Sequence, residues 1–247
     1  MPEPYYQDDL VTLYHGDCLE LADLWTCADV LITDPPYGTE LMSTANGNAG
    51  GYGRASRAQR TAERTSRGYV RRQSAAGKGV LNTGRHGCLI AGDDGTKTRD
   101  AMLAAWGDRP ALLFGSPRMP DPPMNVADRL VWNKTRPGMN GGPWRYLHES
   151  IYVTAGFVRV NNSAVSIISA WPDQTDHIHA KPQKLMVPLV SAAPPGTIAD
   201  PFVGSGSTLV AAKALGRKAI GVELEEKYCE ITARRLAQDA LDFGGGE

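Results

Sequence analysis

"GTIADPFVGSGSTLVAAKALGRKAIGVELEEKYCEITARRLAQDAL", residues 196–241, decides the fold. An apolar run ends in an acid and a glycine-rich turn, and a segment with helical spacing, a second apolar run and a long amphipathic segment follow. This order predicts a strand, a turn, a helix, a strand and a helix. Such a unit implies two parallel strands joined by a right-handed crossover. We therefore expect an α/β fold with a doubly wound, mostly parallel sheet, formed by the whole chain (residues 1–247) as a single domain.

The glycine-rich turn "DPFVGSGST" has the features of a nucleoside site. Asp200 ends a strand, and Gly204 and Gly206 allow a ligand to approach the backbone where a helix starts. Glu223 ends the next strand, where an acid binds ribose hydroxyls in dinucleotide folds. Leu209 stands in place of a third glycine, and no P-loop lysine follows. We therefore expect a nucleoside ligand without a pyrophosphate. S-adenosylmethionine fits this description.

A second unusual stretch is "ITDPPYG", residues 32–38, which follows the apolar run "DVLIT". Proline fixes φ and has no N–H donor, so Pro35 and Pro36 hold the backbone rigid. The end of this strand thus presents the Asp34 carboxylate, a rigid carbonyl and the Tyr37 ring together. The alternative is a proline-rich strand exit with Tyr37 packed on the core.

Composition excludes several classes of protein. Lys and Arg number 26 against 27 Asp and Glu, so the chain is not uniformly basic. No apolar run approaches 18 residues, and the acidic N-terminus is unlike a signal peptide. The cysteines are scattered, which indicates reduced thiols in a cytoplasmic protein, without a disulfide framework or a metal site. They are Cys18, Cys27, Cys88 and Cys229.

Residues 39–87 differ in composition from the rest of the chain. Ser, Gly, Ala, Asn, Gln and Arg dominate, and large aliphatic residues are rare. We expect a flexible insertion whose arginines contact DNA phosphates, although it could be only a soluble disordered loop. The candidate DNA-binding residues are Arg54, Arg57, Arg60, Arg64, Arg67, Arg71 and Arg72.

The remaining regular elements follow from apolar periodicity. We expect strands at 88–92, 110–116, 129–134 and 148–155, and helices after Asp17, at 97–107 and at 181–193. Pro188 must kink or frame the last of these helices.

"DPPY" followed by "DPFVGSGST" resembles the amino-group DNA methyltransferases, specifically the permuted β-type. "HGDCLE", "HIHAKPQKL" and "LVWNK…HESIYV" are similar to further stretches of that family. The resemblance implies that catalysis rests on Asp34, Pro35, Pro36 and Tyr37. The cofactor-binding residues that it and the glycine turn imply are Asp17, His177, Lys181, Asp200, Phe202, Gly204, Gly206, Ser207, Thr208 and Glu223.

The resemblance implies transfer of a methyl group from S-adenosylmethionine to the amino group of a flipped adenine in double-stranded DNA, as in restriction-modification. Aspartate as the first residue of "DPPY" favours adenine, and the cytosine amine is the alternative. Cytosine carbon chemistry needs a Pro-Cys pair, which is absent. RNA or protein substrates, a nicotinamide oxidoreductase and a non-catalytic DNA-binding module are further alternatives. Relatives of this family often form homodimers.

Several of these residues also have a purely structural interpretation. Glu223 and Asp17 could cap the helices that follow them. His177 could be an ordinary loop residue, and Lys181 a solvated helix residue. For Trp132, a place in the core is favoured over a role in base stacking.

Overall fold

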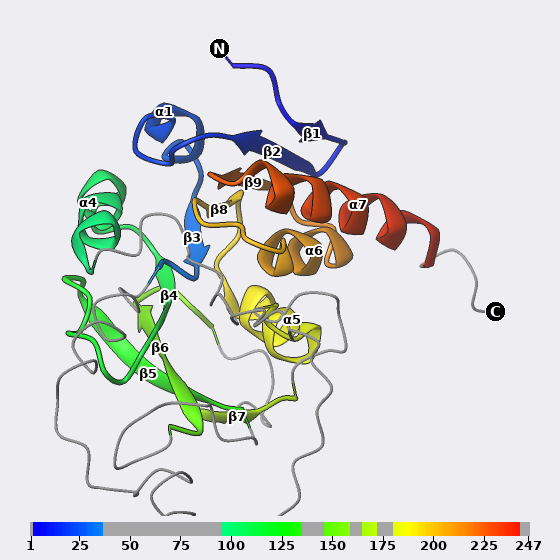
Figure 1. Cartoon of the computed structure of the whole chain (residues 1–247). Coiled ribbons are helices and arrows are strands. Elements are labelled where there is room, and N and C mark those ends of the chain that lie inside the picture. Colours follow the sequence, from blue (N-terminus) through cyan, green and yellow to red (C-terminus); the bar gives the residue numbers. More distant parts are fainter. Residues whose placement is uncertain (1, 37–94, 135–145, 159–164, 172–179, 243–247) are drawn as a thin grey trace, which may run out of the picture.

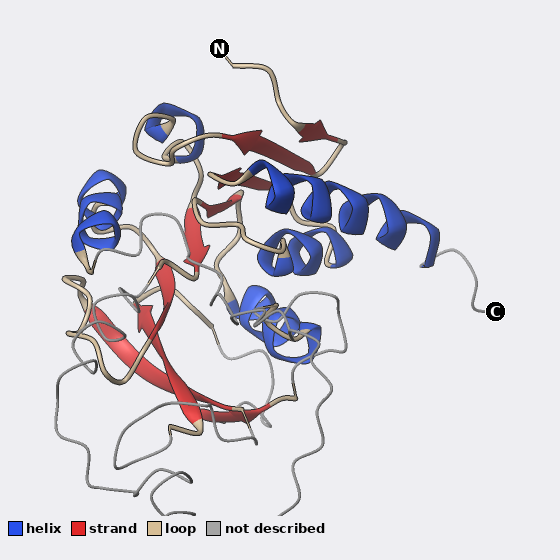
Figure 2. Ribbon diagram, in the orientation of Figure 1, coloured by secondary structure: helices blue, strands red, loops and turns tan. Residues whose placement is uncertain are grey.

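The structure, a computed structural model, describes residues 2–36, 95–134, 146–158, 165–171 and 180–242. Within these segments, nine strands form one sheet with helices on both sides (Figures 1 and 2). The strands are β1 (Tyr6–Gln7), β2 (Val11–His15), β3 (Val30–Thr33), β4 (Ala111–Gly115), β5 (Val126–Asn133), β6 (His148–Thr154), β7 (Ile167–Ser169), β8 (Ile198–Asp200) and β9 (Ala219–Glu223). The helices are α1 (Ala22–Trp25), α4 (Lys97–Trp106), α5 (Gln183–Ala192), α6 (Ser207–Ala214) and α7 (Glu226–Asp242).

The strands follow the order β1-β2-β9-β8-β3-β4-β6-β5-β7 across the sheet. Parallel pairing joins β2 to β9, β9 to β8, β8 to β3, β3 to β4 and β5 to β7. Antiparallel pairing joins β1 to β2, β4 to β6 and β6 to β5. The structure thus confirms the expected α/β fold with a mostly parallel sheet in a single domain.

The connections that follow two neighbouring parallel strands, β3 and β8, run to opposite sides of the sheet. From β3 the chain passes to β4 on one side, whereas from β8 it passes through α6 to β9 on the other side. The carboxyl ends of such a pair form a topological switch point, which is where open α/β sheets bind their ligands. Asp34 follows β3 and Asp200 ends β8, so the two stretches singled out in the sequence meet at this point.

Two apolar clusters hold helices on the two faces of the sheet. Val30 and Ile32 of β3 pack toward α5, α6 and α7, while Leu31 packs toward α1 and α4. On the second face the indole rings of Trp25 and Trp106 stack with their centroids 6.1 Å apart. Because side chains alternate along a strand, an uninterrupted apolar run is buried on both faces, as expected for a central parallel strand.

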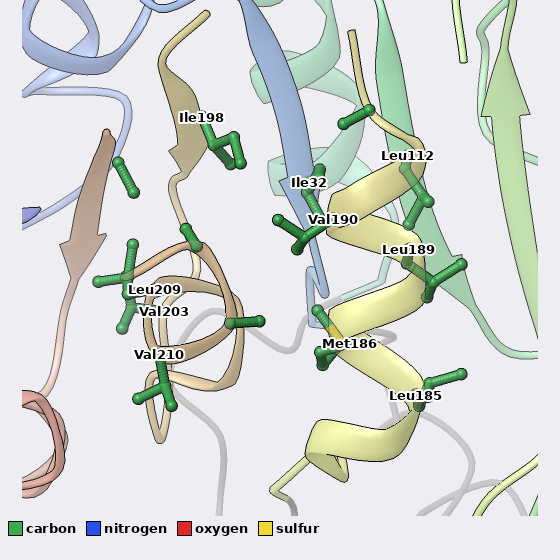
Figure 3. Packing of buried hydrophobic residues seen from close by; sticks show 14 of the residues in the cluster. Ile32, Leu112, Leu185, Met186, Leu189, Val190, Ile198, Val203, Leu209 and Val210 are labelled. Carbon is green, nitrogen blue, oxygen red and sulfur yellow. The ribbon is translucent and has the colours of Figure 1, made fainter. Parts of the chain in front are cut away.

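Helix α5 continues through Pro188. The proline lies on the exposed face of the helix, while the opposite face packs on the sheet. That face carries Leu185, Met186, Leu189 and Val190, which belong to the same buried cluster as Ile32 of β3 and Leu112 of β4 (Figure 3). Pro188 therefore removes a backbone donor on the solvent side and leaves the buried face of α5 intact.

Some boundaries differ from the sequence expectations. β1 and β7, of two and three residues, were not expected, because such short edge strands have no clear periodicity. β5 begins at Val126, earlier than the expected 129. The expected strand at 88–92 and the insertion at 39–87 lie outside the described residues. Within the described segments, no helix has the length and apolarity needed to cross a membrane.

Candidate active site

Four acidic side chains follow one another along the carboxyl edge of the sheet. Because β2, β9, β8 and β3 are parallel neighbours, Asp17, Glu223, Asp200 and Asp34 all lie at this edge in that order. Neighbouring strands are about 4.8 Å apart, so the row extends over roughly 15 Å. This length suits a nucleoside with an attached side chain.

The glycine turn between β8 and α6 is held tightly by groups around it. Gly206 has a φ of +82° and precedes the first residue of α6. A Cβ atom at this position would lie 2.7 Å from Cγ2 of Thr232 on α7. The Thr232 hydroxyl donates to the Gly204 carbonyl at 3.0 Å, and the Arg235 guanidinium donates to the Ser205 carbonyl. Helix α7 therefore fixes the backbone of the turn from behind.

Glu223 fixes the same turn from β9. Its Oε2 accepts from the Gly204 N–H at 2.7 Å, and its Oε1 accepts from the Glu225 N–H at 2.8 Å. The side chain is buried, and this burial raises its pKa. The second of these bonds lies just before α7, as the capping interpretation expected. A carboxylate has about four lone-pair sites, so these bonds leave capacity for ribose hydroxyls.

Asp200 is buried between the glycine turn and β3. Its Oδ1 accepts from the Thr33 hydroxyl at 2.6 Å and from the Phe202 N–H at 3.1 Å. Burial raises the pKa of Asp200 to about 6, and hydrogen bonds from Thr33, Thr208 and the Phe202 N–H only partly offset this, while the charge of Asp34 adds to the rise. Because burial disfavours the ionised form of Asp200, this carboxylate is well placed to bind a cationic ligand group.

Asp200 should make stability depend on pH. Since its folded pKa lies above the unfolded value near 3.9, its contribution favours folding below about pH 4 and is lost as the pH rises through about 6. We expect Asp200→Asn to raise the free energy of unfolding by roughly 2 kcal/mol at pH 7.5 and by little at pH 4. Urea unfolding across this range measures the difference. The exposed Asp128 of β5 gives a control variant, Asp128→Asn, and an Asp200→Asn effect that is equal at all pH values would contradict the prediction.

Asp17 lies in the turn that follows β2. Its Oδ1 accepts from the Leu19 N–H at 2.7 Å and from the Glu20 N–H at 3.4 Å. It therefore caps the turn that leads to α1, as the structural interpretation expected. The side chain is half-buried and remains at the same edge as Glu223.

Asp34 lies beside a buried lysine. The Lys181 ammonium donates to Oδ2 of Asp34 and lies 3.0 Å from Oε2 of Glu149. Lys134 forms an ion pair with the other oxygen of Glu149. Lys181 is 8% exposed, so the interpretation as a solvated helix residue is wrong. From the sequence, Lys181 is expected to bind the cofactor, and no role is expected for Glu149 or Lys134, although both lie in the stretch "LVWNK…HESIYV" that resembles the family.

Of the other sequence expectations, the place of Trp132 can be checked in the structure, whereas several candidate residues lie outside its described part. Trp132 is buried, and its indole N–H donates to the Ala170 carbonyl at 3.0 Å, so its place in the core is confirmed. Among the described residues, the cysteines are free and no cluster could hold a metal ion. The remaining candidates lie outside the described residues. They are Tyr37, His177, Arg54, Arg57, Arg60, Arg64, Arg67, Arg71 and Arg72.

A mostly parallel sheet with acids and a glycine turn at its switch point is typical of α/β proteins that bind nucleoside ligands. The family N6_N4_Mtase, described as DNA methylase, matches residues 28–234, and the chain belongs to this family.

Individual relatives agree with this assignment. The type II methyltransferase M.HinfI of Haemophilus influenzae is 30% identical over 142 residues, which cover 46% of this chain and 40% of that enzyme. The type II methyltransferase M2.LlaDCHI of Lactococcus lactis subsp. cremoris is 23% identical over 269 residues, covering 97% of this chain and 94% of the relative.

Two solved structures share the fold. The M1.HpyAVI-SAM complex has a TM-score of 0.54 at 20% identity and covers 92% of this chain and 100% of its own. The PvuII DNA methyltransferase, which is cytosine-N4-specific, has a TM-score of 0.56 at 15% identity and covers 94% of this chain and 88% of its own.

Proposed function

We propose that the protein transfers a methyl group from S-adenosylmethionine to the exocyclic amino group of adenine in DNA. The observation that carries this proposal is that Asp34-Pro35-Pro36, at the end of β3, lies next to Asp200 and the glycine turn, at the end of β8. The hydrogen bond from the Thr33 hydroxyl to Asp200 joins the two strand ends directly. A group bound at the glycine turn would therefore lie beside the Asp34 carboxylate.

The residues at the sheet edge fit the chemistry of this cofactor. The buried Asp200 carboxylate suits its ammonium, and Glu223 suits its ribose diol. Ser207 is the first residue of α6, and within the described segments its buried hydroxyl has no hydrogen-bond partner. This hydroxyl and the N-terminus of α6 suit the carboxylate of the cofactor. When bound, S-adenosylmethionine supplies an electrophilic methyl group on its sulfonium.

Asp34 and Pro35 act on the target amine. The amine of adenine is a poor nucleophile because its lone pair is delocalised into the ring. Two acceptors within about 3 Å of the nitrogen, here the Asp34 carboxylate and the Pro35 carbonyl, favour a pyramidal nitrogen with a localised lone pair. The prolines keep the carbonyl aimed, so catalysis rests on positioning and on acceptors directed at a nitrogen that becomes positive. When the bond from nitrogen to the methyl carbon forms, the bond from sulfur to that carbon would break, and the methylated nitrogen would then lose one proton to water.

The partner is proposed to be double-stranded DNA with the target base rotated out of the helix, because the amine is paired inside the duplex. Stacking of the base on Tyr37 and phosphate contacts from the arginines of residues 39–87 belong to this proposal. A nicotinamide oxidoreductase would leave the Asp34-Pro35-Pro36 edge unexplained.

The nucleosides of methylated DNA test the choice of base. DNA incubated with the protein and S-adenosylmethionine should yield N6-methyladenine after digestion, as identified by mass spectrometry. Sequencing for modified bases would then map the target site. DNA incubated without the cofactor is the control. N4-methylcytosine as the product would move the assignment to the cytosine amine, and unmodified DNA would refute the proposed function.

A further inference from the structure

Lys181 occupies an unusual place at the carboxyl edge of the sheet. Its ammonium lies between Asp34, which follows β3, and Glu149, which lies on β6. The rings of Phe114 and Trp132 lie 4.9 Å and 5.4 Å from the ammonium nitrogen. The charged group therefore contacts two carboxylates and two aromatic rings.

The backbone supports this placement. Lys181 precedes Pro182, the N-cap residue of α5, and a residue before proline is restricted to extended conformations. The start of α5 thus delivers the side chain to the sheet edge. Burial by itself would lower the pKa of Lys181, but Asp34 and Glu149 outweigh this and raise it, so the ammonium stays charged. Because transfer of an ammonium from water into the protein is costly, two carboxylates beside a buried lysine point to a role for the charge.

We propose that Lys181 is a positioning residue, which orients the Asp34 carboxylate toward the target amine, and that Glu149 holds Lys181 in place. This inference rests on the proposed function, because it requires that Asp34 accepts a hydrogen bond from that amine. The terminal torsion of an aspartate has broad minima, so hydrogen-bond partners help to set the plane of its carboxylate. An ammonium fixed on Oδ2 sets the plane, and a carboxylate can still accept from an amine.

Glu149 also offsets the positive charge that Lys181 brings to the site. A cation next to the reacting amine opposes the positive charge that the nitrogen gains. With Asp34 and Glu149 both ionised, these two carboxylates and the Lys181 ammonium sum to one negative charge. Lys134, which pairs with the far oxygen of Glu149, is 32% exposed and is therefore better screened by water. Glu149 thus permits a lysine to orient Asp34 without leaving the site positive.

The test uses the full-length protein and a duplex carrying its mapped target site. We expect Lys181→Met to lower kcat by about 10- to 100-fold, because a hydrogen bond to a charged group is lost. The dissociation constant for S-adenosylmethionine, measured by calorimetry, and the KM for DNA should stay within about twofold. Lys181→Arg keeps the charge and should recover most of the lost rate. Lys184→Met, which alters an exposed lysine on α5, is the matched control and should behave as the wild type.

A double variant separates positioning from folding. Lys181→Met leaves Glu149 with one cation fewer, which could itself disturb the site or prevent folding. Lys181→Met/Glu149→Gln removes both charges, so it should have nearly the wild-type melting temperature but still a low kcat.

Each of three results would overturn the inference. They are a double variant with restored kcat, a single variant with unchanged kcat, and a single variant whose main defect is weak cofactor binding. A wild-type protein that methylates no DNA would instead refute the proposed function.

Discussion

The Asp34→Ala variant is expected to bind S-adenosylmethionine almost as well as the wild type and to methylate DNA at least 100-fold more slowly. The carboxylate would accept a hydrogen bond from an amine that gains positive charge in the transition state, so its loss affects the transition state more than the bound substrates. Asp200 and Glu223, the acids proposed to bind the cofactor, keep their own hydrogen bonds to main-chain groups. Single-turnover rates and calorimetry with the cofactor measure the two effects separately.

The surroundings of Asp34 make this variant interpretable. Lys181 keeps Glu149 as a partner when Asp34 is replaced, so no buried cation is left alone. Asp23→Ala removes an exposed carboxylate in the first turn of α1 and should leave the rate unchanged. Asp34→Asn preserves the shape and one oxygen acceptor, and its rate should fall between those of the wild type and Asp34→Ala. If Asp34→Ala retained more than a tenth of the wild-type rate, the acceptor role would be wrong.

The unit formed by β8, α6, β9 and α7 could be predicted from the sequence because its information is local. Apolar runs of strand length, glycines at a turn and a long amphipathic segment stand in one continuous stretch, residues 196–241. The switch point could be predicted from the sequence less directly. It needs β3 beside β8, a pairing between residues more than 160 positions apart.

The ion pairs around Asp34 could not be derived in this way. Lys181 and Asp34 are separated by 147 positions, and Glu149 reaches them only because β6 inserts antiparallel between β4 and β5. A sequence pattern shows that a lysine precedes a proline and that a glutamate starts a strand. It does not show that both side chains meet at one carboxylate, because sheet order is set by packing of the whole domain.

Gly206→Ala should have the second large effect, since it combines backbone strain with a steric clash. A residue with a Cβ at a φ of +82° costs about 1–2 kcal/mol, and the new methyl group would lie 2.7 Å from Cγ2 of the fully buried Thr232. Overpacking of this kind costs typically 1–3 kcal/mol more. Because Thr232 also holds the Gly204 carbonyl, relief of the clash moves the turn that the cofactor is proposed to contact. We expect the melting temperature to fall by about 10 °C and cofactor affinity by at least tenfold.

Gly216→Ala is the matched control because it isolates the strain. Gly216 follows the other end of the same helix, its φ is +65°, and in the described part of the chain no atom beyond its immediate neighbours lies within 4 Å of the position of an added Cβ. This variant should lose only about 3 °C in melting temperature, since the strain of about 1–2 kcal/mol acts without a clash, and it should keep its affinity for S-adenosylmethionine. Equal losses of affinity in the two variants would mean that α6 as a whole, rather than the turn clamped by Thr232, determines cofactor binding. A Gly206→Ala protein that binds the cofactor normally would remove the glycine turn from the proposed site.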